Sequence, residues 1–237
     1  MLAPMRFETP SPISRTPALI AASLWGAAGV LWLVFEAITA SAFPGYSYAT
    51  NYISDLGVPD VTVFEGRSID SPLSALMNFA FIAQGLLLLG GVMFALRAAP
   101  GVRGGARTWI LAIAITHAVG MLLVGIFHGS QQNLENGLLV LHGLGAAFAI
   151  ATGNITAILG GITSHRIEAP SWYRITTVFL GIFGLICLVM LAVASTTSFT
   201  AVPEAVWERG SVYTIIGWEL LTSVSLIALA RRAPKLA

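Results

Sequence analysis

Six long apolar stretches constrain this chain more than any other feature of its sequence. Each can cross a hydrocarbon core about 30 Å thick, which takes roughly 20 helical residues. The apolar residues run continuously rather than alternating, and a helix satisfies its own backbone hydrogen bonds in lipid, so the pattern predicts helices and excludes a β-barrel. We therefore expect an all-α membrane bundle of six transmembrane helices. The expected spans are residues 18–42, 72–96, 109–127, 138–161, 173–194 and 212–230.

The amino-acid composition indicates that lipid, rather than water, surrounds most of the chain. Apolar residues make up 56% of the 237 residues and charged residues only 10%, whereas about 25% of the residues of a soluble domain are charged. No basic patch with interleaved aromatic residues is present, so we expect no nucleic-acid partner. Cys187 is the only cysteine, which excludes an intramolecular disulfide and a site built from several thiolates.

The fourth span carries a regular series of small residues. Gly145, Ala149, Gly153 and Ala157 recur every four residues, which places them on one face of a helix. Small residues let a neighbouring backbone approach closely in a membrane. We therefore expect this span to be central in the bundle and to pack tightly against another helix.

Basic residues gather on one side of the predicted bundle. Ten of the twelve lysines and arginines precede the first span, follow the last, or lie between spans two and three or four and five. Because Lys and Arg near span ends stay on the cytoplasmic side, we expect both termini in the cytoplasm and a location in the plasma (inner) membrane. Only Arg67 and Arg209 fall on the opposite side.

The expected organisation is a cytoplasmic tail of residues 1–17, one six-helix domain of residues 18–230, and a cytoplasmic tail of residues 231–237. The first tail contains charged residues and four prolines, and no small-residue cleavage site stands out after the first span. We therefore expect that span to be retained as an anchor rather than removed as a signal peptide.

The longest connection is the outer loop of residues 43–71, whose stretch from Tyr46 to Gly57 reads Y-S-Y-A-T-N-Y-I-S-D-L-G. This stretch is too aromatic for a flexible linker and too polar for a span. Tyrosine favours the headgroup layer, so the loop is predicted to cover the extracytoplasmic mouth of the bundle.

Polar side chains near the outer ends of the spans are candidates for a functional site, because ionisable groups in lipid are costly unless paired or hydrated. Glu36, Asn78 and His142 are expected in the outer third of the bundle, counted at about 1.5 Å per residue. His128 closes the third span and His142 begins the fourth, so both imidazoles are expected to face one pocket, with Asp55 folded inward as a carboxylate partner. Such a set can bind zinc or act as a general acid and base without metal. A metal site of His128, His142 and Asp55 and a structural role at the helix ends both stay open.

Two further groups of charged residues lie on the sixth span. In W-E-R-G, residues 207–210, Glu208 and Arg209 stand at its outer mouth. A guanidinium is a planar fork of donors, so Arg209 is expected to hold an anionic headgroup or to form an exposed ion pair. Deeper in the span, Glu219 is expected near the midplane at the depth of His117. These two are predicted to form a buried polar pair, which serves structure or a proton-coupled pathway.

Several motifs occur in the order found in a known family. They are N-Y-I-S-D-L-G (51–57), S-P-L-S-A-L-M-N-F (71–79), G-I-F-H (125–128), L-H-G-L-G-A (141–146) and W-E-R-G (207–210). With them the chain resembles the bacterial and archaeal membrane family called domain of unknown function 998. It is more distantly similar to the DRAM-type six-span family, in Y-I-S-D-x-G after the first span (residues 52–57) and in His142. Members of that wider group are linked to autophagy and to lipid remodelling, which implies a lipid-facing role by analogy.

The resulting hypothesis is a multi-pass membrane protein whose outward-facing polar pocket binds a lipid or lipid-linked headgroup. Asp55 would orient His142 or a water, and His142 would serve as base or ligand, with Glu208 as a further catalytic carboxylate. Arg209 would hold an anionic group. The other candidate ligand-binding residues are Tyr52, Ser54, Asn78 and His128. The alternatives are a membrane-embedded hydrolase or transferase acting on a lipid, metal-assisted or not, and a small proton-linked transporter. A divalent metal and a homo-oligomer both stay open.

Overall fold

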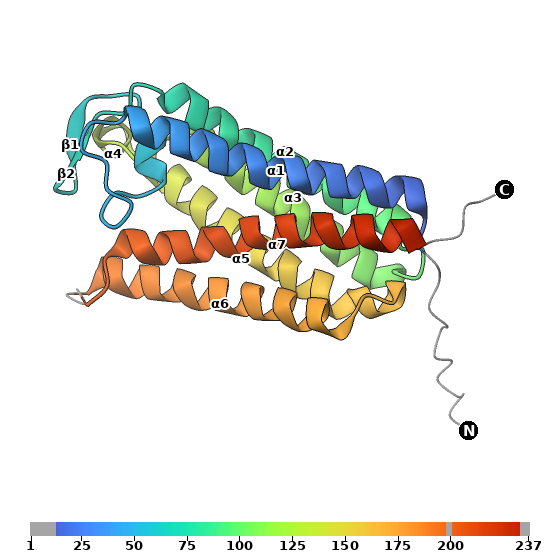
Figure 1. The fold of residues 1–237 in the computed structure, drawn as a ribbon. Coiled ribbons are helices and arrows are strands. Elements are labelled where there is room, and N and C mark those ends of the chain that lie inside the picture. Colours follow the sequence, from blue (N-terminus) through green and yellow to red (C-terminus); the bar gives the residue numbers. More distant parts are fainter. Residues whose placement is uncertain (1–12, 198–200, 233–237) are drawn as a thin grey trace.

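The computed structural model describes residues 13–197 and 201–232. Long helices run side by side along one axis (Figure 1). A loop with a small hairpin lies at one end, which we call the loop end; α1 begins and α7 ends at the opposite end, which we call the termini end. The predicted tails fall largely outside the described residues, since residues 1–12 and 233–237 are not among them.

The long helices confirm the predicted all-α membrane bundle. They are α1 (Arg15–Ala42), α2 (Ser74–Ala98), α3 (Gly104–Ile126), α5 (Leu139–Thr163), α6 (Ser171–Thr196) and α7 (Glu204–Arg232). The 3-10 turn η2 (Ser164–Ile167) extends α5. All six are long and apolar enough to cross a membrane. The last begins at Glu204 rather than at residue 212, because its polar first turns contact the loop instead of lipid.

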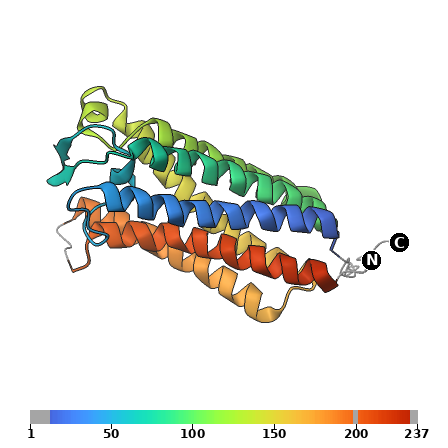
Figure 2. The same ribbon diagram turned by 45° about the horizontal axis from the view of Figure 1, so that its top comes forward.

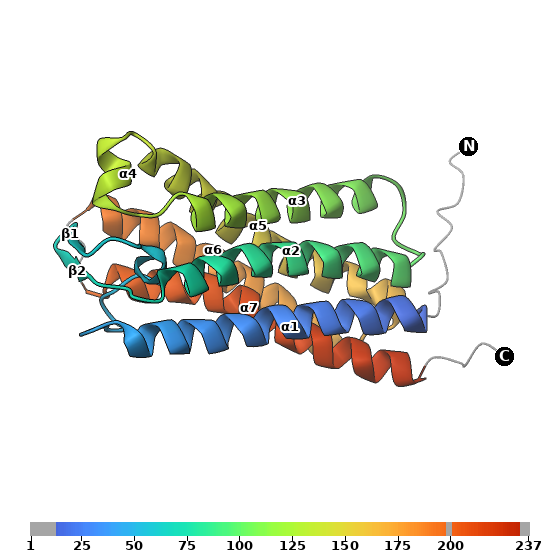
Figure 3. The same cartoon turned by 90° about the horizontal axis from the view of Figure 1, so that it is seen from above.

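The six helices form a closed ring. Each packs on the next along the chain, α1 on α2, α2 on α3, α3 on α5, α5 on α6 and α6 on α7, and α7 returns to α1. Figure 2 shows α1 lying along α7, and Figure 3 shows α2 between α1 and α3. α7 also contacts α5 across the ring. The inner faces of α5 and α7 therefore meet near the centre of the bundle.

The small-residue face of α5 packs as the sequence predicts. Gly145, Ala149, Gly153 and Ala157 are all buried. A Cβ on Gly120 of α3 would lie 2.6 Å from the Ala149 nitrogen and 2.6 Å from the Gly145 oxygen. Backbone atoms cannot move aside, so α3 and α5 approach this closely only because position 120 is glycine.

The connection from α1 to α2 contains structure that the sequence analysis did not predict. It holds the 3-10 turn η1 (Ser54–Gly57) and an antiparallel hairpin of β1 (Thr62–Phe64) and β2 (Arg67–Ile69). Glu65 and Gly66 join the strands with φ of 48° and 77°, as a two-residue turn of type I′ requires. A short helix, α4 (Gln131–Glu135), lies at the same end between α3 and α5.

The loop is part of the core of the loop end rather than a cover lying over it. Ile53, Leu56 and Val58 are 0–2% exposed and pack in one cluster with Trp32 and Phe81 of the helices. Burial of three large apolar side chains holds η1 against the ends of α1, α2 and α7. The polar groups of η1 are thereby held in place beside the helices.

Candidate functional site

A cavity of about 380 Å³ lies at the loop end, between η1, the hairpin, α5, α6 and the first turns of α7. We call it the loop-end cavity. Its loop side is polar, whereas α5 and α6 contribute mainly apolar side chains. Ala147, Ala192 and Ser195 in its wall are exposed on the flank of the bundle. The cavity therefore opens sideways, toward the surface that lipid would cover.

Five of the sequence-predicted site residues line this cavity, from three separate parts of the chain. They are Tyr52, Ser54, Asp55, His142 and Glu208. The predicted residues Arg209, Asn78 and His128 do not line it. The hairpin adds three residues that the sequence analysis did not select, Phe64, Glu65 and Arg67.

Asp55 is directed at the hairpin and not at His142. Its carboxylate accepts hydrogen bonds from Arg67 Nε at 3.0 Å and Arg67 Nη2 at 3.3 Å, and from the Tyr52 amide at 3.0 Å. The Asn51 side chain donates a fourth, at 3.3 Å. The expected contact with His142 is thus wrong, because all the donors to this 1%-exposed carboxylate come from the loop itself. In this position Asp55 fastens η1 to β2.

Arg67 is the residue that the sequence analysis missed. Its guanidinium binds Asp55 in a fork, contacts Glu65 at 3.3 Å, and lies 4.3 Å from the centre of the Tyr52 ring. Burial lowers the pKa of this guanidinium, but the Asp55 carboxylate, together with Tyr52 and Glu65, more than offsets the effect, so the pKa is raised. A signal was present in the sequence, since Arg67 is one of only two basic residues on the acidic side.

His142 presents one free ring nitrogen to the cavity. Its Nδ1 lies 2.8 Å from the Phe127 carbonyl oxygen, which can only accept, so Nδ1 carries the hydrogen. No other described residue hydrogen-bonds Nε2. In the neutral imidazole Nε2 is therefore an acceptor, available to a hydroxyl or ammonium group of a ligand.

Two glutamates in the first turns of α7 accept hydrogen bonds from the loop. Glu208 accepts from the Ile53 amide at 2.5 Å and from the Ser54 amide at 3.4 Å. One turn earlier, Glu204 accepts from the Tyr52 hydroxyl. Burial and this neighbouring carboxylate raise the pKa of the Tyr52 phenol. Glu208 remains part of the cavity wall, where its carboxyl oxygens are hydrogen-bond acceptors.

Arg209 is a loop anchor, so the expectation that it holds a headgroup from this cavity does not match its position. It is 7% exposed and donates from Nη1 to the Asn51 carbonyl at 2.6 Å and from Nη2 to the Tyr46 hydroxyl. Its Nε lies 3.9 Å from Glu36, and its guanidinium lies 5.1 Å from the Tyr48 ring centre. These contacts use the planar fork of donors within the protein.

The two other predicted ligand residues also lie outside the cavity. Asn78 of α2 donates to the Gly57 carbonyl at 2.8 Å and so holds the end of η1. His128 follows α3, where its backbone oxygen accepts from Asn133 at 2.8 Å. Burial lowers the pKa of its imidazole. Neither residue provides a group to a ligand in the loop-end cavity.

The structure does not assemble the metal site considered from the sequence. Across residues 13–197 and 201–232, no group of three or more His, Cys, Asp and Glu side chains is placed to hold a metal ion. Asp55 is committed to Arg67, and His128 does not join His142 in the cavity lining. His128, His142 and Asp55 therefore do not form a ligand set here.

The midplane pair is connected through a third residue. His117 Nε2 lies 2.9 Å from Gln84 Oε1, and Gln84 Nε2 lies 3.1 Å from Glu219 Oε1. His117 Nδ1 lies 2.8 Å from the Ala149 carbonyl. His117 and Glu219 are 1% and 0% exposed. The predicted pair is thus a chain of hydrogen bonds across α5, α3, α2 and α7.

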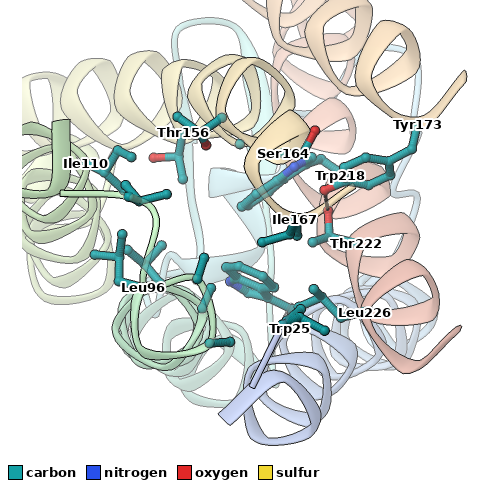
Figure 4. Close-up of a pocket in the computed structure, with 18 residues that line it drawn as sticks. Trp25, Leu96, Ile110, Thr156, Ser164, Ile167, Tyr173, Trp218, Thr222 and Leu226 are labelled. Atoms are coloured by element: carbon teal, nitrogen blue, oxygen red, sulfur yellow. Dashed lines mark hydrogen bonds between the residues drawn. The ribbon is translucent and has the colours of Figure 1, made fainter. Parts of the chain in front are cut away.

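A second cavity, of about 90 Å³, lies toward the termini end (Figure 4). Trp25, Trp218 and Leu226 give it a mainly apolar wall. Tyr173 and Thr222 in its lining hydrogen-bond each other at 3.0 Å. Among the residues that the structure describes, its lining contains no carboxylate and no imidazole. The loop-end cavity is therefore the better candidate for recognition of a polar ligand.

Comparison with known proteins gives a family but no activity. Neither the curated proteins nor the solved structures include a match to this chain. The family model described as "Protein of unknown function (DUF998)" matches residues 26–225. This match extends from α1 to α7 and covers most of the chain, including all the residues that line the loop-end cavity. The chain therefore belongs to the DUF998 family.

Proposed function

We propose that the loop-end cavity binds a lipid or lipid-linked molecule whose headgroup carries hydroxyl or ammonium donors, and that the loop end faces outward. The observation that carries this proposal is the combination of a polar loop side, an apolar side on α5 and α6, and a lateral opening in a single cavity. A headgroup fits the polar loop side, and an acyl chain fits the apolar side on α5 and α6. The outward orientation rests on the distribution of basic residues.

The polar groups of the cavity favour donors over anions. Asp55, Glu65 and Glu208 place three carboxyl groups in the lining, against the single guanidinium of Arg67. The free Nε2 of His142 is an acceptor when the ring is neutral. A headgroup phosphate would meet repulsion on this side, whereas hydroxyl or ammonium hydrogens would find acceptors. The proposed headgroup, with hydroxyl or ammonium donors, replaces the anionic headgroup that we expected Arg209 to hold.

The test is lipid retention by the full chain purified in mild detergent and examined by native mass spectrometry. Phosphatidylethanolamine and a glycolipid offer donor hydrogens, and phosphatidylcholine is the matched headgroup without N–H donors. We expect the first two to be retained in preference to phosphatidylcholine. His142→Ala should reduce that preference about tenfold, the effect of one hydrogen bond of about 1.4 kcal/mol. Ala147→Phe, which fills the cavity, should abolish retention.

The matched control is His165→Ala. His165 also lies 2.7 Å from a carbonyl through Nδ1, that of Ile162, but outside the loop-end cavity. Its substitution should leave retention unchanged. Equal retention of all three lipids by the unaltered chain, or an unchanged preference in both His142→Ala and Ala147→Phe, would contradict the proposal.

A further inference from the structure

The hydrogen-bond chain at the midplane needs one more hydrogen than a neutral His117 and an ionised Glu219 can supply. The Ala149 carbonyl oxygen accepts only, so His117 must donate to it from Nδ1. If His117 is neutral, its Nε2 is an acceptor and needs the amide hydrogens of Gln84. The Gln84 oxygen then faces Glu219, and two oxygens can share a hydrogen bond only if Glu219 is protonated.

The other arrangement places the same proton on histidine. With Gln84 Oε1 toward His117 and Nε2 toward Glu219, His117 donates from both nitrogens and is a cation opposite a Glu219 carboxylate. The two arrangements differ by one proton moved between Glu219 and His117 and by the amide of Gln84 turned over. Each has zero net charge, whereas neutral histidine with a carboxylate leaves one contact without a hydrogen.

The surroundings favour the proton on Glu219. Glu219 is 0% exposed, and its Oε2 has no hydrogen-bond partner among the described residues. A buried carboxylate with one oxygen unpaired is far more costly than a carboxylic acid with a bare carbonyl oxygen. The neutral arrangement also avoids two separated charges in the membrane interior. It requires the Gln84 amide to be turned over from the orientation recorded in the structure, and the two orientations differ only in which end atom is nitrogen.

Other titratable side chains lie on the helices packed around this chain. They include Glu36 on α1, His142 on α5, Tyr173 and Cys187 on α6, and Glu208, Arg209 and Tyr213 on α7. None of them hydrogen-bonds to His117, Gln84 or Glu219. Glu36 has its own partners, Tyr213 at 2.8 Å, Trp32 at 3.0 Å and Arg209 at 3.9 Å. The proton of the chain is thus not shared with a neighbouring acid.

Two small cavities lie between this chain and the loop-end cavity. The first, about 50 Å³, shares Ser54, His142, Ala146 and Glu208 with the loop-end cavity. The second, about 20 Å³, shares Trp32, Met121 and Val212 with the first and is lined by Gln84 and His117. Each exceeds the 10–15 Å³ or so that one water needs. The first has polar side chains in its lining, whereas the open surface of the second is apolar, with Gln84 and His117 in its wall.

We propose that His117, Gln84 and Glu219 form a binding site for a single proton, loaded from the loop-end cavity through these two spaces. The proton arrives as hydronium or by exchange with water and resides on Glu219. The site does not depend on which ligand the loop-end cavity binds. The protonation of Glu219, near the midplane of the bundle, therefore depends on the proton concentration at the loop end.

Infrared spectroscopy of the reconstituted full chain tests the site. We expect a C=O band of a protonated carboxylic acid that is lost in Glu219→Gln and kept in Glu36→Gln, the matched control whose carboxylate has a cation beside it. If Glu219→Gln fails to fold, labelling the unaltered chain with carbon-13 glutamate must shift the same band. Absence of a protonated glutamic acid in the labelled chain, or a band that survives Glu219→Gln, would overturn the assignment.

The route is tested by the rate at which the band shifts after transfer to heavy water. Ala146 lies where the loop-end cavity meets the first small cavity. Ala146→Leu should slow the exchange by about tenfold or more, because it closes that junction. Ala106→Leu, at an exposed position in the first turn of α3 that lines none of these three cavities, should leave the rate unchanged. Exchange in Ala146→Leu as fast as in the unaltered chain would overturn the proposed route.

Discussion

Replacing Arg67 by methionine should loosen the loop without altering the helices. The substitution keeps an unbranched apolar stem but leaves Asp55, 1% exposed, without its cation. Removing one partner of a buried ion pair costs about 3–5 kcal/mol. The Tyr52 amide and the Asn51 side chain still donate to Asp55, so we expect the lower end, about 3 kcal/mol.

Hydrogen exchange read by mass spectrometry is the appropriate assay, because the cost falls on local opening of the loop. The amides of Ile53 and Ser54, which donate to Glu208, report that opening. A loss of about 3 kcal/mol corresponds to exchange about a hundredfold faster. The double variant Asp55→Asn with Arg67→Met should be destabilised by about 2 kcal/mol less than the sum of the two single substitutions.

Arg97→Met is the matched control for this experiment. Arg97 lies 4.8 Å from the Phe94 ring centre and is exposed, with no carboxylate recorded beside it among the described residues. Its loss should cost at most about 1 kcal/mol. If Arg67→Met and Arg97→Met leave the exchange of residues 51–57 equally unchanged, the Asp55–Arg67 pair does not hold the loop and the reasoning fails.

Three further variants test the packing and the loop. Gly120→Ala should lower the thermal unfolding midpoint through overpacking of about 1–3 kcal/mol, whereas Gly143→Ala, with nothing within 4 Å of its Cβ, should not lower it. Asn78→Ala should speed loop proteolysis, since the buried Gly57 carbonyl loses its donor at a cost of about 1–3 kcal/mol. The raised pKa of Tyr52 means that its contribution to stability is complete below about pH 10 and is lost at higher pH. We therefore expect the alkaline titration curves of the unaltered chain and of Tyr52→Phe to differ by one phenol that ionises at a pH above the ordinary range of tyrosine. If the phenol lost in Tyr52→Phe ionises within the ordinary range, the raised pKa of Tyr52 is wrong.

The helices could be predicted from the sequence because lipid imposes one rule on the backbone. Continuous apolar stretches must be helical, and the observed helices overlap all the predicted spans. The small-residue face of α5 could also be predicted, because how closely a neighbouring helix can approach depends on the size of the side chains and on the helical period. These properties are local, so they did not require knowledge of which helices are neighbours.

The partners of the charged residues could not be predicted in this way. Asp55 has Arg67 as its partner, and Arg209 has Asn51 and Tyr46, all through contacts made by the folded loop. Both arginines stood out as basic residues on the acidic side, and both proved to be anchors of the loop, Arg209 buried and Arg67 partly buried. The hairpin was missed because its strands have three residues each, too few for alternation to be recognised.

An experimental structure in lipid nanodiscs would show whether the loop-end cavity receives a lipid headgroup. We expect headgroup density within hydrogen-bond distance of His142 Nε2 and Glu208, continuous with an acyl chain that leaves between α5 and α6. A cavity filled only by water, with ordered lipid confined to other faces of the bundle, would rule out the proposed lipid site.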